Sequence, residues 1–124
     1  MIVLPDWLWW LPIGKVREVS PQTLRGWLAE HQAVQLIDVR SDLEYRRGTI
    51  GNSLHIPRHT FRNSPAVDRL DTTKPVVVIC LRGLRSRPGA AWLRSKGYDA
   101  YTLQGGIMAW LGADLCLETP QNKE

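Results

Sequence analysis

The sequence predicts an α/β fold with a central, mostly parallel sheet of about five strands and helices on both faces. Short β-branched runs alternate with amphipathic segments along the chain, which is the pattern of βαβ units. Two of these runs, 34–39 and 76–79, are apolar enough to be buried on both faces, as strands of a parallel sheet are. Serine and proline stand where helices should begin, and glycine where they should end.

The first half of the chain predicts three strands and two helices. Ser20 followed by Pro21 is typical of a helix start, because serine caps the first amides and proline suits the first helical position. Ser41 can cap the second helix in the same way, and Gly48 is a natural residue just past its end. The expected elements are a strand at 16–19, a helix from Ser20 to about His31, a strand at 34–39, a helix from Ser41 to Arg47 and a strand at 53–56.

The second half predicts two more strands, each followed by a helix. Pro88 is tolerated in a first helical turn, where the backbone needs no intrahelical donor. Gly105 and Gly106 form a tight turn into the last helix, and the polar tail from Glu118 is expected to be loosely held. The expected elements are a loop and short helix at 58–70, a strand at 76–79, a helix at 87–96, a strand at 100–103 and a helix at 107–111.

The chain divides into a tryptophan-rich arm at 1–15, a domain at 16–112 and a tail at 113–124. The arm crowds Trp7, Trp9 and Trp10 between two prolines, which argue against a regular helix, and it is too short to span a bilayer. We expect these tryptophans to pack on the domain's own surface. A homodimer or protein-partner contact and a contact with membrane headgroups are the alternatives.

Composition excludes several classes of protein. A domain of 124 residues can bury a sufficient core without a disulfide or metal staple. Two cysteines do not make a disulfide framework and no Cys/His spacing resembles a zinc site, so no metal is expected and a reducing, cytoplasmic compartment fits best. The net charge is only +4 and no basic run interleaves with aromatics, so no nucleic-acid partner is expected.

The stretch from Val76 to Lys96 concentrates the chemistry. A buried strand ends at Cys80, a glycine-containing loop follows, and Ser86 is placed to cap the next helix. The N–H groups of such a loop favour an anion and would stabilise a thiolate. Between Cys80 and Lys96 lie five basic residues and no acidic one, against a net charge of +4 for the whole chain. We therefore expect a reactive Cys80 thiolate that meets an anionic or sulfur-bearing substrate, the alternative being a cysteine that only ends a buried strand.

Three sequence blocks resemble the rhodanese family of sulfurtransferases, in its single-domain form. Residues 36–57, L-I-D-V-R-S-D-L-E-Y-R-R-G-T-I-G-N-S-L-H-I-P, are similar to the family's D-V-R…E-[YF]-x-x-G-H-I-x-G block. Residues 80–86, C-L-R-G-L-R-S, are similar to its C-x-x-G-x-R-S loop, and residues 103–110, L-Q-G-G-I-M-A-W, to its L-x-G-G block. The resemblance frames residues 16 to 112 and implies a three-layer, rhodanese-like α/β fold.

The resemblance implies transfer of sulfane sulfur without a metal or organic cofactor. Cys80 would take the outer sulfur of thiosulfate or of a related persulfide or polysulfide donor, and the resulting persulfide would pass it to a thiol or cyanide. The partners are then small sulfur-bearing molecules. The implied active-site loop, whose amides would cradle the persulfide and whose last arginine would hold the loop or the donor's charge, consists of Leu81, Arg82, Gly83, Leu84, Arg85 and Ser86.

The length of this loop separates two kinds of relative. Four residues lie between Cys80 and Arg85, as in the sulfurtransferases, whereas the related phosphatases and arsenate reductases have five and a wider cradle. An arsenate reductase or phosphatase activity is therefore the weaker alternative. A rhodanese-like binding or regulatory module is the other, but such modules usually replace the cysteine that this chain keeps.

Several residues outside the loop complete the hypothesis. Asp38 and Arg40 end a neighbouring strand. Asp38 is expected to cap that strand end or to form an ion pair, and Arg40 to pair at the surface or between loops, with a supporting role at the site as the alternative for both. Leu81 stands where many members carry arginine, which bears on the choice of donor, and Thr49 stands where the family often has histidine, which we expect to have a local structural effect. Cys116 is expected to be a packed or surface thiol, with a relay role as the alternative.

Overall fold

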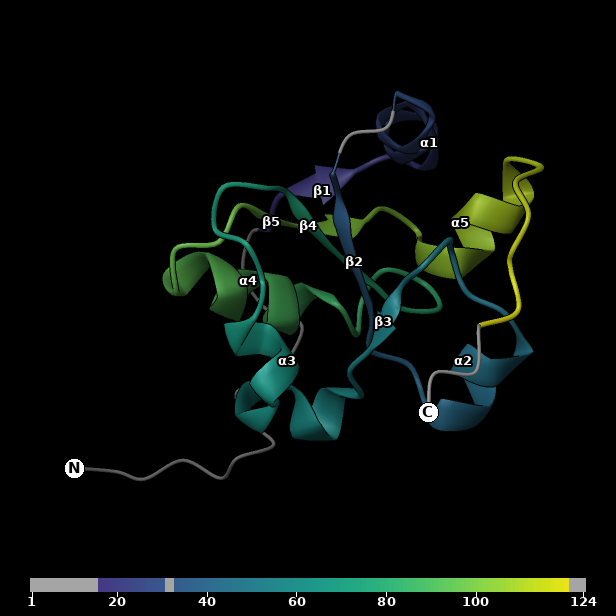
Figure 1. The fold of residues 1–124 in the computed structure, drawn as a ribbon. Coiled ribbons are helices and arrows are strands. Elements are labelled where there is room, and N and C mark those ends of the chain that lie inside the picture. Colours follow the sequence, from purple (N-terminus) through teal and green to yellow (C-terminus); the bar gives the residue numbers. More distant parts are fainter. Residues whose placement is uncertain (1–15, 31–32, 121–124) are drawn as a thin grey trace.

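The computed structural model describes residues 16–30 and 33–120, so the tryptophan-rich arm at 1–15 lies outside the described residues. Its centre is one sheet of five strands, all parallel, in the order β1-β5-β4-β2-β3 (Figure 1). The strands are β1 Glu18–Val19, β2 Gln35–Asp38, β3 Leu54–His55, β4 Val76–Ile79 and β5 Ala100–Leu103. The predicted α/β class, the parallel sheet and its five strands are confirmed.

Helices cover both faces of the sheet (Figure 1). One face of the sheet packs with buried residues of η2, α3 and α4, among them Phe61, Val67 and Leu93. The other face packs with Leu24 of α1 and with Ile107 and Trp110 of α5. The helices are α1 Pro21–Ala29, α2 Asp42–Arg47, the 3-10 helix η2 Arg58–Asn63, α3 Pro65–Asp68, α4 Arg87–Ser95 and α5 Gly106–Gly112.

Alternating side chains of β4 explain why this strand lies in the middle of the sheet. Its four residues are all buried, because Val76 and Val78 face one helical layer while Val77 and Ile79 face the other. Burying a valine or isoleucine side chain contributes about 1.5–3 kcal/mol. The central position follows from this apolar run and places Cys80, the next residue, between the ends of two neighbouring strands.

Most predicted boundaries hold to within a residue or two. Ser20 and Ser41 both cap their helices as expected, and Ser41 forms a full capping box with Glu44. The strand predicted at 16–19 forms only at its last two residues. The stretch 58–70, expected to be a loop and a short helix, contains two short helices. The second begins at Pro65 and is capped by Ser64, whose side chain accepts a hydrogen bond from the amide of Ala66.

The tail is tied to the domain where looseness was expected. Glu118 exchanges both backbone hydrogen bonds with Thr49, at 2.9 and 2.8 Å. Leu115 and Leu117 pack against the buried cluster that includes Ile50 and Trp110. The prediction that the chain is loose from Glu118 onward is therefore wrong at Glu118, because apolar residues just before it hold the segment down. None of the described helices is both long and apolar enough to cross a membrane.

Candidate active site

Cys80 follows β4 directly and is buried, with 1% of its surface exposed. In the parallel sheet β4 lies between β5 and β2 (Figure 1). The cysteine, which follows β4, therefore lies at the middle of the carboxyl edge. This is the edge at which parallel α/β sheets bind ligands. The structure thus places Cys80 at the end of a buried central strand, as the sequence predicts.

Two groups of the following loop contact the sulfur atom. The amide of Gly83 donates a hydrogen bond to Cys80 Sγ at 3.0 Å, and Ser86 Oγ lies 3.3 Å from the same atom. Ser86 was predicted to cap the helix that follows it, but its side chain makes no capping hydrogen bond. Its hydroxyl faces Cys80 and Thr102 instead, because Ser86 itself has helical backbone angles and its side chain is fully buried.

The first turn of α5 holds the cysteine loop in place. The amides of Ile107 and Met108 donate to the carbonyl oxygens of Cys80 and Leu81, each at 2.9 Å. A peptide group is planar with its N–H opposite its C=O. When those two carbonyls point to α5, the N–H groups of Leu81 and Arg82 must point away from it. The third sequence block therefore serves to orient the amides of the second.

Glycine is required where these two segments touch. Gly83 and Gly106 both have positive φ, at 85° and 60°. A side-chain carbon on Gly106 would overlap the carbonyl oxygen of Cys80, and one on Gly83 would come within 2.8 Å of the amide nitrogen of Gly105. The glycines allow the two backbones to approach closely.

The loop keeps several amides without a protein acceptor. Across the described chain, no acceptor takes the N–H groups of Leu81, Arg82, Leu84, Arg85 and Ser86, whereas Gly83 donates to the sulfur. Successive unpaired amides of this kind form an anion-binding nest. The arrangement can therefore stabilise negative charge on Cys80 and on an atom bonded to it.

The loop's arginines differ in what they contact. Arg85 forms an ion pair with Glu44 of α2, with Nη2 and Oε2 3.2 Å apart. Partial burial acts to raise the pKa of Glu44, but hydrogen bonds from Arg85 and Ser41 outweigh it, and the pKa lies below its ordinary value. Arg85 thus holds the loop to α2, while Arg82 is exposed and forms no ion pair with the described residues.

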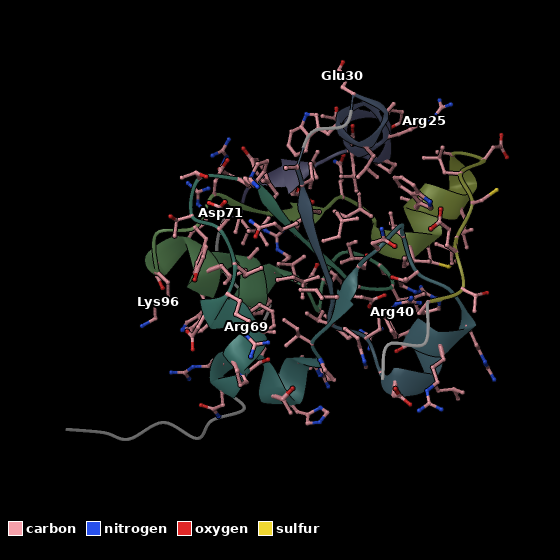
Figure 2. The ribbon with its side chains drawn as sticks, in the orientation of Figure 1. Arg25, Glu30, Arg40, Arg69, Asp71 and Lys96 are labelled. Atoms are coloured by element: carbon pink, nitrogen blue, oxygen red, sulfur yellow. The ribbon has the colours of Figure 1, made fainter. Side chains whose placement is uncertain are left out.

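Asp38 and Arg40 lie in a separate buried network. Arg40, labelled in Figure 2, lies where β2 runs into α2. Its guanidinium pairs with the Asp38 carboxylate at 2.8 Å and also donates to the carbonyl of Gly48. Thr49 donates its hydroxyl to the same carboxylate at 2.8 Å, which accounts for a buried threonine at this position. No hydrogen bond joins Asp38 or Arg40 to Cys80 in the described chain, so the pair supports the neighbouring loops and is not hydrogen-bonded to the sulfur.

Some residues of the site were not predicted. Glu44 and the fully buried Thr102 were overlooked. The signal for Thr102 was a hydroxyl residue within the short strand A-Y-T-L that precedes the glycine pair. Cys116 is exposed.

A hollow of about 870 Å³ is lined by Tyr45, His55 and Glu118 among others. No residue of 80–86 lines it, so this hollow is separate from the cysteine loop.

Comparison with known proteins finds relatives among rhodanese-like domains and sulfurtransferases. The family model described as a rhodanese-like domain matches residues 20–113. The chain is similar to a thiosulfate sulfurtransferase GlpE of Actinobacillus pleuropneumoniae serotype 3, at 31% identity over 82% of this chain and 93% of the relative. A crystal structure of a rhodanese-like domain protein from Staphylococcus aureus superimposes with a TM-score of 0.74 at 30% identity, over 85% of this chain and 99% of that one.

Other relatives are much longer than this chain. A tRNA uridine(34) hydroxylase of Erwinia tasmaniensis is 39% identical over 60% of this chain, but the match spans only 23% of that relative. The chain therefore corresponds to about a quarter of such a protein. The shared part is a domain that is used both alone and within larger proteins.

Proposed function

Because the chain belongs to the rhodanese-like domain family, we propose that it is a sulfurtransferase that carries sulfane sulfur on Cys80. The donor is thiosulfate or a related persulfide or polysulfide, and the acceptor is a thiol or cyanide. One observation carries the proposal: Cys80 Sγ accepts a hydrogen bond from the amide of Gly83, in a loop whose remaining amides have no acceptor in the described chain.

The reaction needs two attacks on sulfur. The Cys80 thiolate attacks the outer sulfur of thiosulfate; a new S–S bond forms, the old one breaks, and sulfite leaves with the bonding pair. The acceptor thiolate then attacks the outer sulfur of the persulfide, and Cys80 leaves as the thiolate. With cyanide the product is thiocyanate. No electrons are gained or lost overall, so the chemistry requires no external oxidant or reductant.

The loop's contacts support each stage of this reaction. The amide of Gly83 and the hydroxyl of Ser86 are close enough to stabilise Sγ as a thiolate and as the leaving group. The unpaired amides can hold the outer sulfur of the persulfide. Arg82 is exposed and offers a positive charge to an anionic donor, one residue later than the arginine of many members of the family.

Mass spectrometry after incubation with thiosulfate tests the proposal. The protein should gain the mass of one sulfur atom, about 32 Da, and cyanide should remove it with release of thiocyanate. Cys116→Ser should behave like the parent, because the exposed Cys116 has no such loop around it. Cys80→Ser should take up no sulfur; persistent uptake by this variant would overturn the assignment. Failure of the parent to load from thiosulfate, a polysulfide or a protein persulfide would favour the binding-module alternative.

A further inference from the structure

We propose that Thr102 is a positioning residue for Cys80, acting through the hydroxyl of Ser86. The inference rests on the proposed sulfur transfer and adds a residue outside the cysteine loop to that site. Thr102 is in β5, next to β4, and its hydroxyl is hydrogen-bonded to Ser86 Oγ. Ser86 Oγ in turn lies 3.3 Å from Cys80 Sγ. The three polar atoms form a chain that begins in the sheet and ends at the reacting sulfur.

The three side chains are buried from water, so their polar atoms must find hydrogen-bond partners within the protein. Cys80 is 1% exposed, and both Ser86 and Thr102 have no exposed surface. A buried hydroxyl without a partner costs the full desolvation of that group, so each hydroxyl here must be satisfied by its neighbour. Thr102 in β5 pairs with Val78 in β4, and Val78 precedes Cys80 by two residues. Thr102 therefore lies beside the end of β4 at which the cysteine follows.

Counting donors fixes the direction of the hydrogen bonds. A thiolate can only accept, and Ser86 has a single hydroxyl proton. If Ser86 donates that proton to Cys80, its oxygen is free to accept, and the neighbour that can donate is Thr102. Thr102 donating to Ser86 therefore matches the state in which Ser86 stabilises the Cys80 thiolate. The donated bond also polarises the Ser86 hydroxyl and strengthens the bond it makes.

The choice of threonine supports this direction. A β-branched side chain has restricted χ1 in a strand, so the hydroxyl of Thr102 is held in one place. A serine before a helix would otherwise tend to bond to nearby backbone groups, as cap residues do. The partner in β5 keeps Ser86 turned to the sulfur. This accounts for the missing helix cap at Ser86 and for the polar residue inside β5 by one interaction.

Two substitutions separate this role from simple packing. Thr102→Val keeps the shape and removes the hydroxyl, whereas Thr102→Ser keeps the hydroxyl and removes a methyl group. The readouts are the rate of sulfur loading from thiosulfate and the rate of Cys80 alkylation by iodoacetamide at one neutral pH, in a Cys116→Ser background. We expect Thr102→Val to slow both about fivefold to tenfold, within the range expected for the loss of a hydrogen bond between two uncharged hydroxyls. Thr102→Ser should stay within about twofold of the parent. The reverse order, with valine like the parent and serine slow, would overturn the proposal.

A double variant tests whether Thr102 acts through Ser86. Adding Thr102→Val to Ser86→Ala should change neither rate further, whereas an additional slowing would contradict the proposed chain. Should Thr102→Val not fold, Thr102→Ser against Thr102→Ala provides the same comparison, since those variants differ by the hydroxyl alone. Alkylation does not require sulfur transfer, so a protein that never loads sulfur would refute the proposed function while the order of the alkylation rates still decides the role of Thr102.

Discussion

Two polar clusters lie at neighbouring strand ends on the carboxyl edge, and they differ in what remains unpaired. After β2, the Asp38 carboxylate accepts from Arg40 and Thr49, and the Arg40 guanidinium also reaches the carbonyl of Gly48. After β4, the loop around Cys80 leaves amides without an acceptor in the described chain. A buried cluster whose charges are paired holds structure, whereas a loop with several unpaired amide donors is suited to a ligand. Position on the sheet alone would not distinguish the two.

Removing Asp38 from its pair with Arg40 after β2 should give the largest effect and tests whether this cluster is structural. Asp38→Ala leaves the Arg40 charge buried without its partner, so the free energy of unfolding should fall by about 3–5 kcal/mol. Urea unfolding followed by circular dichroism measures this. Asp42→Ala removes the exposed ion pair with Arg46 and should cost under about 1 kcal/mol. Equal losses in the two variants would show that the buried network is not a scaffold.

A second variant disturbs the β4 cluster through its support. Gly106→Ala would force a side-chain carbon into the carbonyl oxygen of Cys80 at a residue with φ of 60°. We expect a loss of about 2 kcal/mol in unfolding free energy and a fall of about 100-fold in the rate of sulfur loading, because the amides around the sulfur are displaced. Gly112→Ala is the matched control: it lies in the same helix, has open space around it and should be neutral or slightly stabilising. Normal loading by Gly106→Ala would mean that this contact does not shape the loop.

The smallest effect is expected at the ion pair between Arg85 of the cysteine loop and Glu44 of α2. Because the pKa of Glu44 is lowered in the folded protein, its pairing with Arg85 adds stability above the ordinary pKa of a glutamate, and this is lost as the pH falls through the folded-state pKa. Glu44→Gln should therefore cost under about 1 kcal/mol at neutral pH and nothing at strongly acidic pH. Thermal unfolding across pH measures this. A difference that persists in acid would show that the cost does not come from the charge.

Local sequence signals predicted the scaffold better than the site's inner contacts. Ser20, Ser41 and the β-branched run at 76–79 each act within their own element, so composition and spacing were sufficient to place them. Ser86 stands at the N-cap position of α4 as predicted, but its side chain makes no capping hydrogen bond, because its partner, Thr102, is 16 positions away and belongs to another strand. Glu118 was expected to be loose for a similar reason, since its partner Thr49 lies far away in sequence. Contacts between elements depend on the assembled fold, which a single sequence does not display.

The hydrogen bonds from Ile107 and Met108 to the cysteine loop have an entropic consequence. Fixing the backbone of one residue costs about 1–2 kcal/mol. Here the loop is fixed as part of folding, because its carbonyls complete the first turn of α5 and its glycines pack against that turn. A donor molecule then meets amides that are already aligned, and little of its binding energy is consumed in ordering the protein. The loop gains this rigidity from the segment that follows β5, nearly thirty residues further along the chain.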